Sequence, residues 1–295
     1  RPTLPSWSLA GAALALALGT GACTPAGVYG TIGKGAPRVS RFLVEPAGKC
    51  SGPLHSYSWQ MCCPIQVPIH EALRSTEDLQ SFVRLHGEKG RVRPVGALHS
   101  SNNQICVEHA LDRAVRVTSP KLDADYVDVR VDEARGANNT REFVADIDAS
   151  LTLADLNERL SALGYTLGFG SVFFRGVTVA GALATGAHGS SLRQSSVLSS
   201  RLRSITLVDA DGELRTFTPD NTAGAPDLWP ALQTHMGQLG IVTRVKLEVE
   251  KDFWAEVTTD HHHENRLLRP GAVETLLEDC QWGHIVWYPR AHHYL

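Results

Sequence analysis

Hydrophobic residues recur at helical spacing in two parts of the chain. Leu79, Phe82 and Val83 form one face of a segment that follows Ser75, whose hydroxyl can accept a backbone hydrogen bond, and that ends at Gly87. Thr152 can cap a second helix in the same way. The hydrophobic positions of that helix are Leu153, Leu156, Leu160 and Leu163, and Gly164 lies just past its end. A further helix is predicted to begin within residues 226–233.

Other segments alternate hydrophobic and polar residues with a period of two, which is typical of half-buried strands. The predicted strands are residues 91–95, 126–131, 142–148 and 241–249. Residues 204–208 and 213–218 flank Asp211-Gly212, a sequence that favours a tight turn, and therefore predict a β-hairpin. Hairpins mixed with single helices predict an α+β fold class rather than a doubly wound parallel sheet.

The composition narrows the function classes. The 295 residues are 43% hydrophobic and 20% charged, with a formal net charge of −3, which is ordinary for a globular protein. No long basic run is present, so we expect no nucleic-acid partner. Adjacent histidines occur at 261–263 and 292–293, but neighbours on an extended strand point to opposite faces and no carboxylate or cysteine completes a set. We therefore expect no metal site.

Residues 1–60 differ from the rest of the chain. Pro2 to Gly33 carry no charge, and Leu9 to Leu18 form a short apolar run followed by small residues. This pattern predicts a signal peptide, because the run is short for a membrane span. An organelle-targeting leader and a membrane anchor are the alternatives, so membrane association stays open. Six cysteines fit export, and we expect a leader and linker over 1–60 of a secreted or exported protein.

Three segments rich in small residues follow one another along the chain. Residues 176–189 contain four glycines, four alanines and two threonines, and no charge. Such a segment lets backbone N–H groups approach a bulky anionic ligand, although it also suits a tight contact between a helix and its neighbour. Residues 93–100 form a second small-residue turn upstream, and residues 237–243 form a third downstream.

In this order the three segments resemble the FAD-binding (PCMH-type) domain of the vanillyl-alcohol-oxidase superfamily. They are most similar to the sugar-lactone and polyol oxidases, namely the gulonolactone, arabinonolactone and alditol oxidases. The resemblance implies a two-subdomain FAD-binding domain over residues 61–250, with FAD as cofactor. It also implies oxidation of a hydroxyl-bearing carbon of a small-molecule lactone or polyol, with hydride passing to flavin N5 and electrons to oxygen or another acceptor. The alternatives are a sterol or other alcohol oxidase of the same fold, and a non-catalytic FAD-binding remnant.

The resemblance also assigns residues to the cofactor. His99 stands where relatives bond covalently to the flavin 8α carbon, although Leu98 replaces the glycine or other small residue that usually precedes that histidine. The alternative role of His99 is ordinary hydrogen bonding within the turn. The alternative role of Ile241 and Val242 is packing in the core as strand residues. The implied contacts are Pro94, Val95, Gly96, Ala97, His99, Ser100 and Ser101, then Thr178, Gly181, Ala182, Thr185, Gly186, His188 and Gly189, then Ile241 and Val242.

In these relatives a substrate cap follows the flavin domain and supplies the catalytic acid or base. We expect residues 251–295 to be the beginning of an incomplete cap, with 284–289 as its first strand, and the chain to be a fragment. His188 is the one residue here considered as a base, with a structural hydrogen-bonding role as its alternative. The sequence therefore assigns no catalytic residue.

Overall fold

The computed structural model describes residues 52–56, 61–71, 75–100, 102–117, 129–135, 141–169, 176–191, 193–262 and 264–286. The chain divides into two compact units, one of residues Glu45–Phe253 and one that combines Arg1–Val44 with Trp254–Leu295. The predicted domain boundaries at residues 60 and 250 stay predictions.

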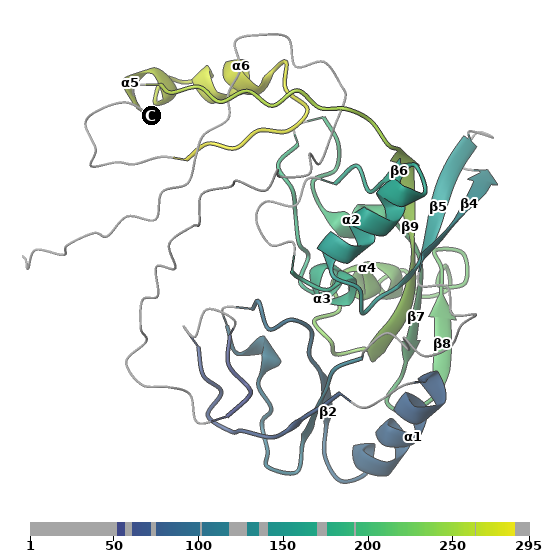
Figure 1. Cartoon of the computed structure of the whole chain (residues 1–295). Helices are drawn as coiled ribbons and strands as arrows, with labels where there is room; N and C mark the ends of the chain where they lie inside the picture. The colour runs from purple at the N-terminus through teal and green to yellow at the C-terminus, as the bar shows by residue number, and fades with distance from the viewer. Residues whose placement is uncertain are drawn as a thin grey trace, which may run out of the picture. The chain divides into compact units, whose positions relative to one another are not determined.

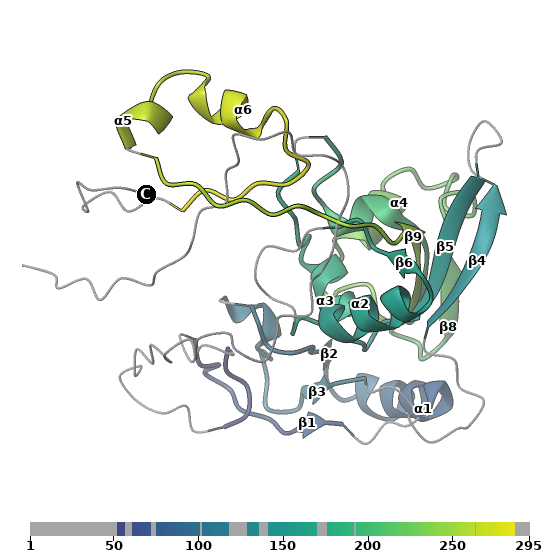
Figure 2. The ribbon, with the colours of Figure 1, turned by 45° about the horizontal axis from the view of Figure 1, so that its top comes forward.

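The first unit begins with a small parallel sheet. Its strands are β1 (Ile69–His70), β2 (Val92–Pro94) and β3 (Arg113–Val115), in the order β1-β3-β2 (Figure 2). The connection from β1 to β2 contains helix α1 (Thr76–Gly87), and that from β2 to β3 contains the 3₁₀ helix η1 (Asn103–Ile105). Ser75 caps α1 by accepting a hydrogen bond from the N–H of Asp78, as the sequence predicts.

The second sheet of this unit is antiparallel and larger. Its strands are β4 (Val129–Arg135), β5 (Arg141–Asp148), β9 (Ile241–Lys251), β7 (Leu202–Val208) and β8 (Leu214–Phe217), in that spatial order, with β6 (Tyr165–Thr166) paired to β9 (Figure 1). The predicted hairpin is confirmed, because β7 and β8 pair across a turn in which Gly212 has a φ of 75°. Helices and both kinds of sheet together confirm the α+β class.

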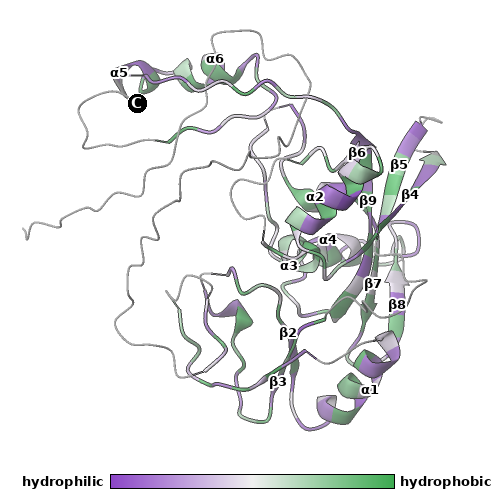
Figure 3. Cartoon of the chain, viewed as in Figure 1, coloured by the Kyte–Doolittle hydropathy of each residue, from purple (hydrophilic) through white to green (hydrophobic). Residues whose placement is uncertain are grey.

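The main core lies between the large sheet and its helices. These helices are α2 (Leu153–Ala162), α3 (Val179–Ala184), the 3₁₀ helix η3 (Leu198–Arg201) and α4 (Leu228–Gln233). Thr152 caps α2 by accepting from the N–H of Asp155, and Leu156 and Leu160 are fully buried. Figure 3 shows that α2 carries both hydrophilic and hydrophobic residues, as expected of a helix that packs one face against a core. The prediction that Leu163 belongs to the hydrophobic face of this helix is wrong, because the helix ends before Leu163 and this residue is 49% exposed.

The small sheet has its own hydrophobic core, and a disulfide bond forms part of it. Cys63 and Cys106 are bonded, and both pack with Leu54 in a cluster that also contacts Leu98. Cys106, which is isolated in the sequence, thereby ties the segment before β1 to the connection between β2 and β3. A separate cluster contains Val115 of the small sheet together with Val208 and Ile241 of the large sheet, so the two sheets are packed into one unit.

The described part of the second unit contains the short helices α5 (Glu264–Leu267) and α6 (Ala272–Leu277). Of the strand predicted over 284–289, residues 284–286 are described, and they contain one β-bridge residue, His284. The histidines at 263, 292 and 293 lie outside the described ranges. Within those ranges no helix has the length and apolar character to cross a membrane, and no three acidic, cysteine or histidine side chains gather as metal ligands.

Candidate functional site

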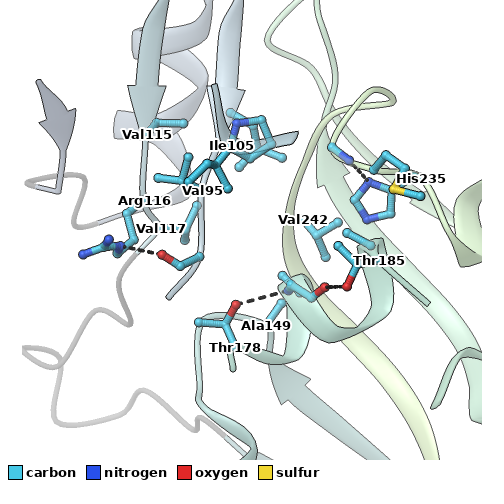
Figure 4. Close-up of a pocket in the computed structure, with 18 of the residues that line it drawn as sticks. Val95, Ile105, Val115, Arg116, Val117, Ala149, Thr178, Thr185, His235 and Val242 are labelled. Atoms are coloured by element: carbon cyan, nitrogen blue, oxygen red, sulfur yellow. Dashed lines mark hydrogen bonds between the residues drawn. The ribbon is translucent and has the colours of Figure 1, made fainter. Parts of the chain in front are cut away.

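A cavity opens within residues 45–253 where the two sheets meet (Figure 4). The small sheet and its flanks provide Val95, Val115 and Val117, and the large sheet provides Val242 on the opposite wall. The three small-residue segments, which are far apart in sequence, all contribute to this lining. Of the predicted contacts, the cavity is lined by Pro94, Val95, Gly96, Ser100, Thr178, Gly181, Thr185, Ile241 and Val242.

Helix α3 forms one wall, because residues 176–189 begin with a capped helical turn. The hydroxyl of Thr178 accepts a hydrogen bond from the N–H of Gly181 at 3.1 Å. Ala180, Gly181 and Ala184 lie on the face toward the cavity. Ala182 does not line the cavity, because helical periodicity turns its side chain into the core, where it is fully buried.

The first segment approaches α3 closely enough to require glycine. A Cβ atom on Gly96 would lie 2.6 Å from the hydroxyl oxygen of Thr178, a distance that real Cβ contacts essentially never show. Arg116 fixes the same loop by donating from Nε to the carbonyl oxygen of Gly96 at 3.0 Å. Among the described lining residues Arg116 is the charged side chain, so the lining of the cavity is largely apolar.

The turn at His99 has a left-handed residue directly before the histidine. Leu98 has a φ of 60°, a conformation that glycine adopts without steric cost and other residues rarely do. His99 is half-buried, and its Nε2 lies 3.4 Å from the position that a Cβ atom would take on Gly176. Burial lowers the pKa of the His99 imidazole, which favours the neutral ring. His99 thus faces the start of the 176–189 segment, but neither it nor Ala97 lines the cavity, and Ser101 lies outside the described residues.

The third segment forms the remaining wall and again depends on glycine. Gly237 has a φ of 70°, and a Cβ atom there would lie 2.9 Å from Cγ of Pro94. The carbonyl oxygen of Met236 accepts a hydrogen bond from Arg93 at 3.5 Å, which joins this segment to the first. Ile241 and Val242, at the start of β9, are buried in the core and also line the cavity, and their contact with FAD stays a prediction.

His235 is a lining residue that the sequence does not reveal. It is 6% exposed, and its Nδ1 accepts a hydrogen bond from the N–H of Gly237 at 3.1 Å. Burial lowers its pKa to about 4. Its Nε2 is buried without a hydrogen-bond partner. The position shows no motif, because both its burial and its hydrogen bond depend on a turn formed by the following glycine.

Several predicted contacts lie away from the cavity. His188 is exposed, its Nδ1 is 3.0 Å from the carbonyl oxygen of Gly189, and it forms a β-bridge with Val197. His188 does not line the cavity, since the chain has already left it at Gly186. Gly186 and Gly189 do not line the cavity either. The lining residues that the sequence did not assign are Gln104, Ile105, Val115, Arg116, Val117, Ala149, Ser150, Ala180, Ala184, His235, Met236, Gly237 and Gly240.

Comparison with known proteins identifies the ligand class of this site. A family model described as "FAD binding domain" matches residues 71–218, which is half of the chain and includes two of the three segments. The chain belongs to this FAD-binding domain family. FAD is therefore its cofactor, and the resemblance to the sugar-lactone oxidases is confirmed.

Known lactone oxidases are similar to this chain at low sequence identity. The chain is 25% identical over 218 residues to L-gulonolactone oxidase of Scyliorhinus torazame, which covers 73% of this chain and 44% of that protein. It is 29% identical over 196 residues to D-arabinono-1,4-lactone oxidase of Saccharomyces cerevisiae, covering 66% and 34%. Against L-gulonolactone oxidase of Bos taurus it is 22% identical over 232 residues, covering 78% and 47%. The chain thus spans less than half the length of these relatives.

The residues of the cavity fit FAD. At Gly96 and Gly237 a Cβ atom would come within 3 Å of a residue of another segment, and at Gly181 it would come within 3 Å of the cap residue Thr178, so backbone groups rather than side chains border that part of the cavity. The apolar lining suits the aromatic rings of a dinucleotide, and a buried donor on His235 has no partner within the protein. The individual contacts to FAD stay predictions.

Proposed function

We propose that this chain carries the FAD-holding part of an oxidoreductase that oxidises a hydroxyl-bearing carbon of a sugar lactone or polyol. The observation that carries the proposal is the cavity itself, in which the three segments that define the resemblance meet. The names of the relatives, L-gulonolactone oxidase and D-arabinono-1,4-lactone oxidase, support a sugar lactone as substrate and oxygen as acceptor. Bound FAD supplies the acceptor for the hydride that leaves the substrate carbon.

The residues around the cavity hold and shield the cofactor. The loop from Gly96 to Ser100 and the start of α3 at Thr178 provide backbone and hydroxyl groups for the polar parts of FAD. Val95, Val115 and Val242 exclude water from its rings. These residues bind and orient FAD. The group that deprotonates the substrate hydroxyl is not assigned.

We further propose that His99 bonds covalently to the flavin 8α carbon. Forming this bond removes one hydrogen from the imidazole and one from the 8α methyl group, and passes two electrons to oxygen. A neutral imidazole is the nucleophilic form, and the burial that lowers the pKa of His99 favours that form. The position of His99 against Gly176, at the beginning of the 176–189 segment, supports an attachment point at the rim of the cavity.

Flavin reduction tests the oxidoreductase. The chain is loaded with FAD and mixed without oxygen with L-gulono-1,4-lactone, D-arabinono-1,4-lactone, xylitol or cholesterol, and the visible absorbance of oxidised flavin is followed as a measure of reduction. We expect bleaching with a lactone or polyol. Bleaching by cholesterol alone would contradict the substrate class, and FAD binding without bleaching by any compound would contradict oxidation by this chain.

Denaturing electrophoresis with in-gel flavin fluorescence tests the covalent bond. Fluorescence should remain with the native protein and disappear in His99→Ala. His109→Ala is the matched control, since His109 is exposed and does not line the cavity, and it should keep the fluorescence. Fluorescence that survives in His99→Ala would place the bond elsewhere, and its absence from the native protein would contradict covalent attachment.

We propose export of the protein on the basis of its N-terminal segment. The disulfide between Cys63 and Cys106 supports this, because such bonds persist mainly in oxidising compartments. Fractionation of cells that express the chain with a C-terminal tag tests the proposal. Retention of the full-length chain with cytosolic markers would contradict it.

A further inference from the structure

His235 presents a buried polar atom that the fold itself does not use. Its side chain lines the cavity and is 6% exposed, and its Nε2 makes no hydrogen bond within the protein. Burying a donor without a partner is unfavourable, because the donor loses its hydrogen bond to water, so native proteins rarely retain one. A ligand in the cavity would remove this penalty.

The hydrogen bond on the other side of the ring fixes what Nε2 can offer. The backbone N–H of Gly237 donates to Nδ1, so Nδ1 carries no proton (Figure 4). The ring is neutral, because burial lowers the pKa of His235 to about 4. Its one proton is therefore on Nε2, which is a donor and not an acceptor.

The surroundings of Nε2 select the kind of acceptor. In the cavity His235 lies near Thr185 and Val242, and no charged side chain of the described lining other than Arg116 is present (Figure 4). A phosphate against the ring would favour the imidazolium, whereas an uncharged oxygen or nitrogen suits a neutral N–H. Met236 lines the cavity next in sequence, and its flexible side chain can move to admit the ligand.

We propose that Nε2–H of His235 donates a hydrogen bond to an uncharged acceptor atom of FAD, and that His235 is a cofactor-binding residue. The inference rests on the proposed function, because it takes FAD as the occupant of this cavity. The proposed contact comes from His235, which lies just before the third segment. The family motif assigns no cofactor contact to this position.

Affinity for FAD separates this role from a structural one. In the full chain with His99→Ala, which keeps FAD dissociable, the dissociation constant is measured by quenching of flavin fluorescence. His235→Asn places an amide oxygen near the Nδ1 position, where it can accept from Gly237, but removes the Nε2 donor. We expect it to weaken FAD binding about fivefold to tenfold, the effect of one neutral hydrogen bond. His235→Gln returns a donor near the Nε2 position and should recover most of the affinity.

His262→Asn is the matched control. His262 is also buried, at 7% exposure, with an unpartnered Nε2, but it does not line the cavity. This variant should bind FAD like its parent. A loss of affinity equal to that of His235→Asn would overturn the proposal, because the effect would then follow from altering any buried histidine.

Nuclear magnetic resonance of the histidine rings gives a readout that does not depend on a substitution. The Nε2–H signal of His235 should shift when FAD is added, and this signal decides the matter if both His235 variants lose affinity alike. An unmoved signal, or unchanged affinity in His235→Asn, would overturn the proposal. The same shift with inorganic pyrophosphate alone would overturn the uncharged acceptor. Failure of the native chain and of the His99→Ala parent alike to bind FAD would instead refute the proposed function.

Discussion

Acid should destabilise the FAD-free chain in part through His235. This side chain is buried as a neutral ring, and burial lowers its pKa from 6.5 to about 4. Because the folded-state pKa lies below the unfolded value, the unfolded chain binds more protons between these two pH values. Stability is therefore retained above pH 6.5, falls as the pH decreases through this window, and reaches its full loss below about pH 4.

The size of the effect follows from the shift. A displacement of one pKa unit corresponds to about 1.4 kcal/mol, so the complete loss from His235 is about 3 kcal/mol. Between pH 7.5 and pH 5, where protonation of the unfolded chain is nearly complete and that of the folded chain has barely begun, the expected loss is about 2 kcal/mol. His86 and His99 have pKa values lowered by burial and act in the same direction, so the native chain alone cannot isolate one residue.

The assay compares urea unfolding of the FAD-free chain and of His235→Asn at several pH values from 7.5 to 5. The variant keeps an acceptor for the N–H of Gly237 but has no titrating group at this position. It should lose about 2 kcal/mol less than the native chain over this range. His109→Asn, which alters an exposed histidine and retains His235, should show the native acid loss. Parallel losses in the native chain and His235→Asn would refute a buried neutral ring.

Three further predictions test the framework of the site. Thr152→Ala should lower the free energy of unfolding by about 1 kcal/mol in urea titrations, because it removes the cap of α2. Replacing both Cys63 and Cys106 by alanine should lower it by about 4 kcal/mol in the entropic model, since the bond closes a separation of 43 residues. Gly237→Ala should abolish FAD binding measured by fluorescence quenching, because its Cβ would lie 2.9 Å from Pro94. Gly164→Ala, equally left-handed with open space around it, should cost about 1 kcal/mol of stability and leave FAD binding unchanged.

Local signals in the sequence were sufficient for most of the elements. The helix after Ser75, the helix after Thr152 and the hairpin around Gly212 are confirmed, because caps, periodicity and a turn residue act within a few positions. Strand limits were less accurate. The strand predicted over 126–131 continues to Arg135, because its pairing with β5 extends that far, and the predicted beginning at 126–128 lies outside the described residues.

The walls of the site depended on contacts that no local pattern encodes. Val115 and Ala149 line the cavity because two sheets meet there, although in sequence each is an ordinary strand or turn residue. The bond between Cys63 and Cys106 is similar, because spacing along the chain does not determine which cysteines pair. In the 176–189 segment the composition indicated close backbone approach, but helical geometry decided which residues face the cavity, and Ala182 does not.

Leu98 departs from the residue type that the family pattern has before the histidine. The small residue expected before the histidine corresponds here to a left-handed backbone with a φ of 60°, so the turn has the conformation that glycine would favour. A non-glycine residue in this conformation costs about 1–2 kcal/mol. Leu98 offsets that cost by packing on the cluster that contains the Cys63–Cys106 bond. The cluster that holds the disulfide therefore lies against the turn where FAD is proposed to attach.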